Sequence, residues 1–374
     1  MRAILFRILY LFYRVLRPHS RRNFTAKPQT ILVLQYAMPL GCCVHGTPLY
    51  AALKAANPAV RLIVATRSIG ADTIRHDPNI DILLETTGPG ESFSTFRRVA
   101  REIRSNLAQQ SLAPDLLLQD ASSRKGSYAL FAAMLHLAPT AGFANAPQLY
   151  DRHLDYDPNR SLIDNNLRLA DNAPHREPAV YFTQRNLDHA RSLLPGDSST
   201  IAFVMQGSGG QNTGWHDDRF AEVVRHFEQL DHRIVFLGTA QDAEGIKRIR
   251  SLASSFGRSL AGQTTIPELA AVLAVTDLLI TLDTGTMHVG RGVDVPMVVL
   301  GPSWQKPIEW LPLGKPNARI LRGPDRTDVP TDYRLDEIST ASVIAAVDDL
   351  LAQYPPSSTA REVRAAQRLS TTRA

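Results

Sequence analysis

The sequence has little cysteine, and what it has argues against two kinds of site. Its 374 residues include only two cysteines, Cys42 and Cys43, which are adjacent. Adjacent cysteines rarely bridge each other, so we expect no disulfide framework, and a reducing compartment fits this composition. The chain also has no CxxC pair and no histidine-rich spacing. We therefore expect no metal site.

The excess of charge of one sign is small. The formal net charge is +5, and hydrophobic and charged residues make up 44% and 21% of the chain. These fractions are those of a globular protein rather than a disordered one. A basic surplus favours anionic partners, such as phosphorylated substrates or an acidic membrane surface, or it is simply a solvated basic surface. We predict no nucleic-acid partner.

The N-terminus lacks the long apolar run of a membrane-spanning helix. Residues 1–17 read MRAILFRILYLFYRVLR, in which Arg7 and Arg14 interrupt the apolar stretch. No small-residue cleavage site follows, which argues against a signal peptide. On a helix the aliphatic side chains fill one face and the arginines the other. This pattern predicts an amphipathic helix that binds an anionic membrane surface through residues 1–22, or else one that packs on the protein's own core.

Short apolar runs alternate with helical patterns through the rest of the chain. In the first half we predict strands at 31–35, 60–65, 81–85 and 115–119, helices at 92–107 and 127–137, and a loop before a helix at 49–56, whose first turn suits Pro48. In the second half we predict strands at 200–205, 233–237, 277–282 and 296–300, and helices at 217–229, 243–256 and 267–273. This alternation indicates two doubly wound α/β domains.

The expected domains follow from this pattern. Residues 1–29 form the amphipathic helix and a linker, residues 30–180 the first Rossmann-like domain, residues 181–354 the second, and residues 355–374 a mobile tail. Ligands of open α/β sheets bind beyond the carboxyl ends of the strands. Two such domains facing each other would define a cleft, so the loops that follow strands are the places to look for a site.

Two of these loops carry chemistry. The first, Gln206–Trp215, is glycine-rich, and its Ser208 and Thr213 offer hydroxyl donors to a phosphate. The alternative is a flexible connecting loop that binds no ligand. The second runs from Asp283 to His288 (DTGTMH) between a strand and a helix. Amides at a helix N-terminus attract anions. The alternatives are a helix-capping Asp283 and a core His288.

Read in order, these segments resemble a known family. The pattern G-S-x-x-x-x-x-x-W-x-x-x-R-F is followed by VFLG, LAG, ELAAVLAVTDLLITLDTGTMH and VPMVVLGPS. The first half contributes ILVLQ, LKAANP, DPNIDILLE, DLLLQ and AGF. Together they resemble glycosyltransferase family nine, the heptosyltransferases of the lipopolysaccharide inner core. The resemblance covers roughly residues 30–350.

The resemblance implies a GT-B fold with the donor in the second domain and the acceptor in the first. It implies inverting, metal-independent transfer of a sugar, usually heptose from an ADP-activated donor, with no cofactor. Matched residue by residue, the donor's phosphates and sugar would be held by Asp283, Thr284, Gly285 and His288. Gly207, Ser208 and Thr213 would line the same pocket, and Asp242 would lie at the nucleoside.

The chain departs from the family on the acceptor side and in one donor loop. The family's general base is an Asp after a glycine, whereas here Gly41 is followed by Cys42, whose thiol would need a depressed pKa to act. The stretch 212–214 also has no lysine where the family often has one. Substitute bases are His45, in the same segment, and Asp120, after the DLLLQ strand. Arg124 could meet acidic groups of an acceptor.

These observations predict a peripheral enzyme at the cytoplasmic face of the inner membrane. It would transfer a sugar from a nucleotide-sugar to lipopolysaccharide or a related glycan. Two alternatives stay open. One is a family member that binds a nucleotide-sugar as a scaffold, with catalysis lost. The other is a nucleotide-sugar epimerase, which also uses two Rossmann-like domains.

Overall fold

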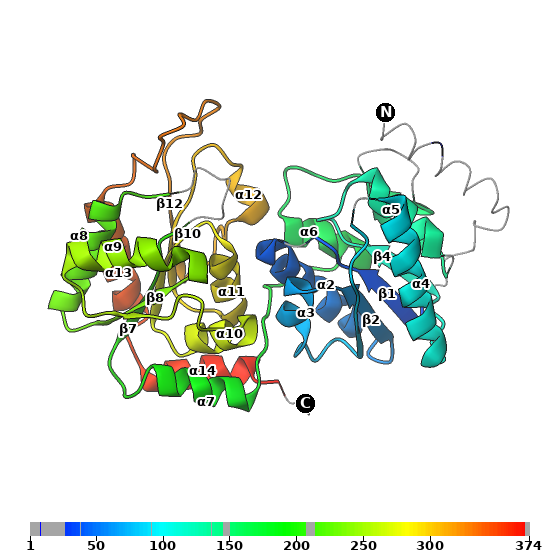
Figure 1. Ribbon diagram of the computed structural model, residues 1–374, viewed down its shortest axis with the longest axis horizontal. Helices are drawn as coiled ribbons and strands as arrows, with labels where there is room; N and C mark the ends of the chain where they lie inside the picture. Colours follow the sequence, from blue (N-terminus) through cyan, green and yellow to red (C-terminus); the bar gives the residue numbers. More distant parts are fainter. Residues whose placement is uncertain are drawn as a thin grey trace. The chain divides into compact units, whose positions relative to one another are not determined.

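The computed structural model describes Ile8 and residues 27–37, 39–90, 92–135, 137–144, 150–206 and 214–370. The chain divides into two compact units, Met1–Pro178 and Ala179–Ala374, each built on a six-stranded sheet (Figure 1). The predicted amphipathic helix lies outside the described residues except for Ile8. Within the described ranges, no helix has the length and apolar character needed to cross a membrane.

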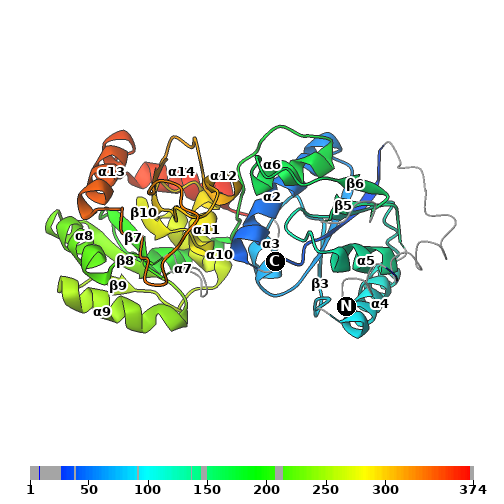
Figure 2. The same ribbon diagram turned by 90° about the horizontal axis from the view of Figure 1, so that it is seen from above.

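Unit 1 is a parallel sheet with the strand order β3-β2-β1-β4-β5-β6. Its strands are β1 Thr30–Leu34, β2 Arg61–Thr66, β3 Ile82–Glu85, β4 Leu116–Gln119, β5 Thr140–Phe143 and β6 Arg152–Leu154. Its helices are α2 Leu40–Ala56, α3 Ile69–Ile74, α4 Phe93–Gln109, α5 Gly126–Leu135 and α6 Leu162–Leu167, followed by the 3-10 turn η1 Arg168–Ala170. Helix α2 packs with α3 and α6, and α4 packs with α5 on the other face (Figure 2). Both faces are covered, which explains the continuous apolar strands.

Helix α2 corrects one expectation. The loop predicted before residue 49 is helical from Leu40, so Pro48 lies inside the helix rather than in its first turn. Proline has no N–H for the carbonyl four residues earlier, here that of Val44. The hydroxyl of Thr47 donates to this carbonyl instead, at 2.9 Å. A neighbouring side chain thus replaces the missing backbone donor, and the helix continues.

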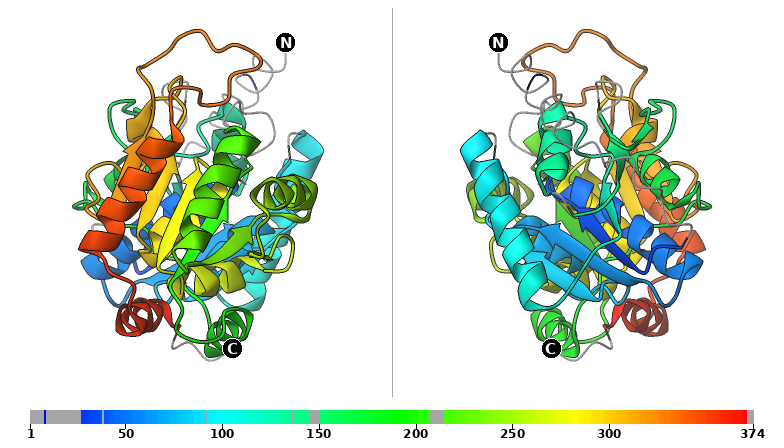
Figure 3. Two further views of the ribbon diagram at one scale, coloured as in Figure 1. Left: turned by 90° about the vertical axis from the view of Figure 1, so that its left-hand side faces the viewer. Right: turned by 90° about the vertical axis from the view of Figure 1, so that its right-hand side faces the viewer.

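Unit 2 repeats the design with the strand order β12-β11-β10-β7-β8-β9. Its strands are β7 Thr200–Val204, β8 Arg233–Leu237, β9 Arg258–Ser259, β10 Leu278–Leu282, β11 Met297–Leu300 and β12 Ala318–Leu321. Its helices are α7 Gln184–Leu193, α8 Asp217–Gln229, η2 Ala240–Asp242, α9 Ala243–Ala253, α10 Ile266–Ala274, α11 Gly285–Val293, α12 Pro307–Trp310, α13 Thr340–Gln353 and α14 Ser358–Arg368. Helix α8 packs with α9 and α13, while α10 packs with α7 and α11 (Figure 3).

Strand order reverses beside the first strand of each sheet. β1 lies between β2 and β4, and β7 lies between β8 and β10. In open α/β sheets, ligands bind beyond the carboxyl ends of the strands at such a switch point. The residues that follow β1 and β4, and those that follow β7 and β10, are therefore where each unit places a ligand.

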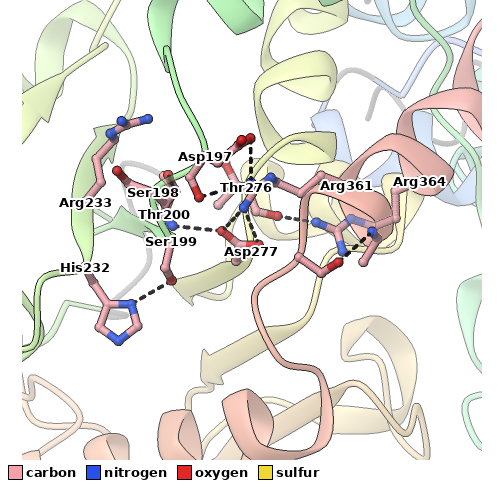
Figure 4. A network of polar contacts seen from close by, with 12 residues as sticks. Asp197, Ser198, Ser199, Thr200, His232, Arg233, Thr276, Asp277, Arg361 and Arg364 are labelled. Carbon is pink, nitrogen blue, oxygen red and sulfur yellow. Dashed lines mark hydrogen bonds and ion pairs between the residues drawn. The ribbon is translucent and has the colours of Figure 1, made fainter.

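The C-terminal segment differs from the expected mobile tail, because it forms α14 and is fixed to unit 2. Arg361 pairs with Asp277, just before β10, at 2.7 Å (Figure 4). Arg364 donates to the carbonyls of Ala274 and Thr276, and Arg368 donates to that of Gly292 at 2.7 Å. Three arginines at helical spacing therefore bind groups between the end of α10 and the start of β10, and in the last turn of α11. The composition of the segment gives no sign of these contacts.

Candidate functional site

In unit 2 the candidate site begins with a buried carboxylate. Asp283 directly follows β10 at the switch point, and only 6% of it is exposed. Burial raises its pKa to about 6. A carboxyl group with such a pKa is partly protonated in mildly acidic solution and can then donate as well as accept a hydrogen bond.

The next residue, Thr284, is the N-cap of α11, a position that Asp283 could have taken. Its side chain makes no capping bond, and its buried hydroxyl has no hydrogen-bond partner among the described residues. Threonine at an N-cap ordinarily satisfies a backbone N–H of the first turn. Here those N–H groups, beginning at Gly285, and the hydroxyl are both left to another acceptor. A helix N-terminus of this kind suits an anion.

His288 lies one turn into α11 and is 4% exposed. Burial, with a smaller contribution from Arg291, lowers its pKa to about 3. Its Nε2 is 3.9 Å from Oδ1 of Asp283, and its ring stands edge-on to Trp310 with 6.0 Å between centroids. At neutral pH the imidazole is uncharged, so the two side chains do not form an ion pair. Neutral imidazole has one N–H to donate.

Two site residues were missed by sequence reasoning, one from the loop after β11 and one from the short helix α12 that ends this loop. With its amide nitrogen facing Asp283, Gln305 donates to Oδ2 of that carboxylate at 3.2 Å, and its oxygen accepts from Nε1 of Trp310 at 3.0 Å. Trp310 ends α12 and also packs on His288. The one available signal was position, because this loop follows a strand next to β10.

Of the other predicted donor residues, the structure describes only Asp242. Gly207, Ser208 and Thr213 lie outside the described residues. Asp242 forms a local cap, since its Oδ2 accepts from the N–H of Thr239 at 2.6 Å and from the hydroxyl of the same residue at 2.9 Å. The structure therefore gives its carboxylate a role at the start of η2 and α9.

In unit 1 the predicted acceptor residues Gly41 and Cys42 lie in the first turn of α2, not in a loop, and both are buried. The adjacent thiol of Cys43 donates to the carbonyl of Ala37 at 3.3 Å and accepts from Gln35 at 3.4 Å. Burial raises the pKa of Cys43 to about 12, so it stays a thiol at neutral pH. This thiol is not a candidate base.

Asp120 follows β4 at the switch point of unit 1 and is 1% exposed. Burial raises its pKa to about 6, although hydrogen bonds act in the opposite direction. The hydroxyl of Ser122 donates to Oδ2 at 2.7 Å, and the amide of Gln119 donates to Oδ1 at 3.3 Å. The carboxylate is thus ionised at neutral pH and basic enough to accept a proton.

Asn166 of α6 links the backbone at His45 to the backbone of the residue after Asp120. Its Nδ2 donates to the carbonyl of fully buried His45 at 3.1 Å, and its Oδ1 accepts from the N–H of Ala121 at 2.7 Å. Arg124, in the same loop as Asp120, lies 3.7 Å over the ring of Tyr156. The predicted acceptor-side residues therefore gather at the carboxyl edge of this sheet.

Metal ligands do not cluster in the parts of the chain that the structure describes. Those residues contain no group of three or more His, Cys, Asp or Glu side chains placed to hold an ion.

Comparison with known proteins identifies the family. Residues 125–335, more than half of the chain, match glycosyltransferase family 9 (heptosyltransferase). The chain belongs to this family. It is 28% identical over 167 residues to lipopolysaccharide heptosyltransferase 2 of Salmonella typhimurium, a match that covers 42% of this chain and 47% of that protein. The chain thus spans about half the length of this curated relative.

Solved structures confirm the expected α/β fold of the GT-B type. A family 9 glycosyltransferase from Veillonella parvula superposes with a TM-score of 0.76 at 22% identity, over 89% of this chain and 99% of that one. The ADP-heptose lipopolysaccharide heptosyltransferase II of E. coli superposes with a TM-score of 0.71 at 18% identity, over 87% and 99%. At these identities the likeness establishes the fold.

Proposed function

We propose that the protein is an inverting glycosyltransferase that transfers a sugar, most simply heptose, from an ADP-activated donor to lipopolysaccharide or a related glycan. The chain belongs to family 9, and one structural observation supports donor binding in it. The unpartnered hydroxyl of Thr284 lies at the start of α11, beside buried Asp283 and His288, at the switch point of unit 2. The name of the E. coli structural relative supplies the donor.

The donor's diphosphate would bind at the amino end of α11. Backbone N–H groups and the Thr284 hydroxyl donate to its oxygens, and the helix dipole adds about half a positive charge. His288, kept neutral by burial, contributes an uncharged donor. The sequence pattern of the family further assigns Gly207, Ser208 and Thr213 to donor binding in this proposal.

In the transfer step an acceptor hydroxyl attacks the anomeric carbon of the sugar from the face opposite the diphosphate. The bond to the nucleoside diphosphate breaks, the diphosphate keeps the bonding electrons, and the hydroxyl proton passes to a base. Asp120 is the better of the two candidate bases, because it is ionised at neutral pH and lies directly at the switch point of unit 1. Stabilisation of the departing diphosphate needs no metal in this scheme.

Calorimetry with ADP-heptose, followed by an assay for free ADP with and without a truncated lipopolysaccharide acceptor, tests the proposal. We expect binding, and ADP release that the acceptor accelerates. A purified protein that binds neither ADP nor ADP-heptose contradicts both transfer and donor binding.

A second candidate function is nucleotide-sugar binding without transfer. The observation in its favour is that Cys42 occupies the position of the family's general base, one residue from a thiol that stays protonated. This candidate predicts ADP-heptose binding with no acceptor-dependent ADP release. The same assay therefore separates the two functions.

We further propose that residues 1–22 hold the enzyme at the anionic cytoplasmic surface of the inner membrane. The alternation of aliphatic residues with Arg2, Arg7, Arg14 and Arg17 supports this proposal. Such an anchor would keep the enzyme close to a lipid-linked acceptor.

A further inference from the structure

The loop that follows β11 is fixed against the site at the start of α11. Gln305 donates to Asp283 and accepts from Trp310, whose ring packs on His288. Arg322 holds the backbone of the same loop, since its Nη2 donates to the carbonyls of Pro302, Ser303 and Gln305 at 3.3, 3.2 and 3.1 Å. The peptide that joins Gln305 to Lys306 is therefore fixed beside the anion site.

Lys306 lies between the two residues that contact Asp283 and His288. It precedes Pro307, which restricts its backbone to extended conformations, and its φ and ψ are −64° and 116°. Its Cα is thus held in place while its exposed four-carbon side chain can turn. The ammonium group makes no hydrogen bond or ion pair with any described residue.

Buried Arg291 of α11 already acts on His288. Among the exposed cations that the structure describes in and beside the loop after β11, Lys306 is the one that no carboxylate engages. The guanidinium of Arg322 also binds Asp325 at 2.7 Å, and that of Arg326 lies 3.5 Å from Glu337. His288 carries no charge at neutral pH. A diphosphate at α11 would bring at least two negative charges next to buried Asp283, and the helix dipole offsets only about half of one. A mobile cation beside the amino end of α11 would offset more of this charge.

We propose that Lys306 binds the diphosphate of the nucleotide-sugar donor, its side chain folding back over the amino end of α11. The proposal rests on the proposed function, because it assumes a nucleoside diphosphate group at this site. It assigns that group's charge partner to the loop after β11. Lys306 would also stabilise the negative charge that accumulates on the diphosphate as the sugar leaves.

Calorimetry of ADP binding to the full chain tests Lys306. Lys306→Gln should weaken binding about tenfold, as expected for loss of one charge-assisted hydrogen bond, while Lys306→Arg should stay within about threefold of the wild type. The wild-type affinity should fall as salt rises, and this dependence should be shallower in Lys306→Gln. Lys247→Gln is the matched control, because Lys247 is an exposed lysine on α9 of the same unit.

The outcomes separate this inference from the proposed function. If the wild type binds no ADP, the proposed donor site is wrong. If the wild type binds ADP and Lys306→Gln binds it equally well with the same salt dependence, Lys306 is not the charge partner. An equal loss in the Lys247→Gln control also overturns the inference, since the effect would then come from net charge.

Discussion

Arg361 of α14 donates from Nη1 to both carboxylate oxygens of Asp277, at 2.9 and 2.7 Å (Figure 4). Both residues are less than a tenth exposed, and Asp277 also accepts from the N–H of Thr200 at 2.8 Å. Arg361→Met would leave a buried carboxylate without its cation. We expect the free energy of unfolding of the domain to fall by about 3–5 kcal/mol, measured by urea denaturation.

An exposed ion pair between α7 and α14 is the control. Arg191 and Glu362 lie 2.5 Å apart, but their side chains are 41% and 58% exposed. Arg191→Ala should change the free energy of unfolding by less than about 1 kcal/mol. The double variant Asp277→Asn with Arg361→Met should recover part of the loss, because it no longer buries an unpaired charge. Equal effects of Arg361→Met and Arg191→Ala would contradict the assigned role of the buried pair.

The second prediction concerns the hydrogen bond from the Thr47 hydroxyl to the carbonyl of Val44. Thr47→Val removes the donor that replaces the missing N–H of Pro48, and we expect it to destabilise unit 1 by about 1 kcal/mol. In a Pro48→Ala background the backbone N–H is restored, so the same substitution should have almost no effect. Thermal and urea unfolding of all four combinations measure this coupling. Additive effects would show that the hydroxyl does not substitute for the backbone donor.

Asp283 and His288 make opposite contributions to the pH dependence of stability. The pKa of Asp283 in the folded state is about 6, above the ordinary value of 3.8 for an aspartate, so its ionisation destabilises the folded state as pH rises from about 4 to 6. The pKa of His288 in the folded state is about 3, below the ordinary value of 6.5 for a histidine, so folding becomes less favourable as pH falls through the same range. Between about pH 4 and 6 the two contributions cancel.

Single substitutions should expose each contribution. Relative to the wild type, the free energy of unfolding of Asp283→Asn should rise by about 1.4 kcal/mol per pH unit between pH 4 and 6, because only the His288 contribution remains. For His288→Gln it should fall by a similar amount per unit. Urea denaturation at several pH values measures both slopes. Slopes of the same sign in the two variants would mean that the burial-driven pKa shifts do not hold.

The membrane proposal predicts a difference between the full chain and one that lacks residues 1–22. The full chain should float with vesicles that contain anionic lipid, whereas the truncated chain should not. Replacing Arg2, Arg7, Arg14 and Arg17 by Gln should weaken flotation and keep the apolar face. Equal flotation of the full and truncated chains would assign any membrane binding to another part of the protein.

Much of the fold could be predicted because parallel strands buried on both faces appear as short apolar runs. The runs at Ile31–Leu34 and Leu278–Leu282 mark β1 and β10 for this reason. Pro48 misled the prediction of α2, because a local rule for proline does not include the hydroxyl of Thr47. The composition of residues 355–374 suggested mobility, since the partners of Arg361 and Arg368 lie about 80 residues away in sequence.

The candidate site was predictable where chemistry coincides with a strand-to-helix junction. Asp283 and His288 were found in this way. Gln305 and Trp310 were not, because their contacts with that pair arise only when β11 packs beside β10. The role of Asn166 in linking α2 to the loop after β4 was hidden for the same reason.

The choice between Asp120 and His45 as the base makes the last prediction. A carboxyl group can accept a proton only in its ionised form. With Asp120 as the base, the transfer rate should therefore rise as pH increases through about 6 and then level off. Asp120→Asn should lower kcat by about 10²–10⁴-fold while ADP binding stays intact. Sugar transfer and calorimetry on the same preparations measure the two quantities.

A second variant makes this assignment sharper. The hydroxyl of Ser122 donates to Asp120 at 2.7 Å and lowers the pKa of that carboxyl group. Ser122→Ala should therefore move the rising limb of the pH–rate profile to higher pH and leave the maximal rate nearly unchanged, whereas an effect on packing alone would lower the rate at every pH. His45→Asn should keep the position of the limb. If His45→Asn abolishes transfer and Asp120→Asn retains it, the base is His45, which would have to become accessible from its buried position in α2.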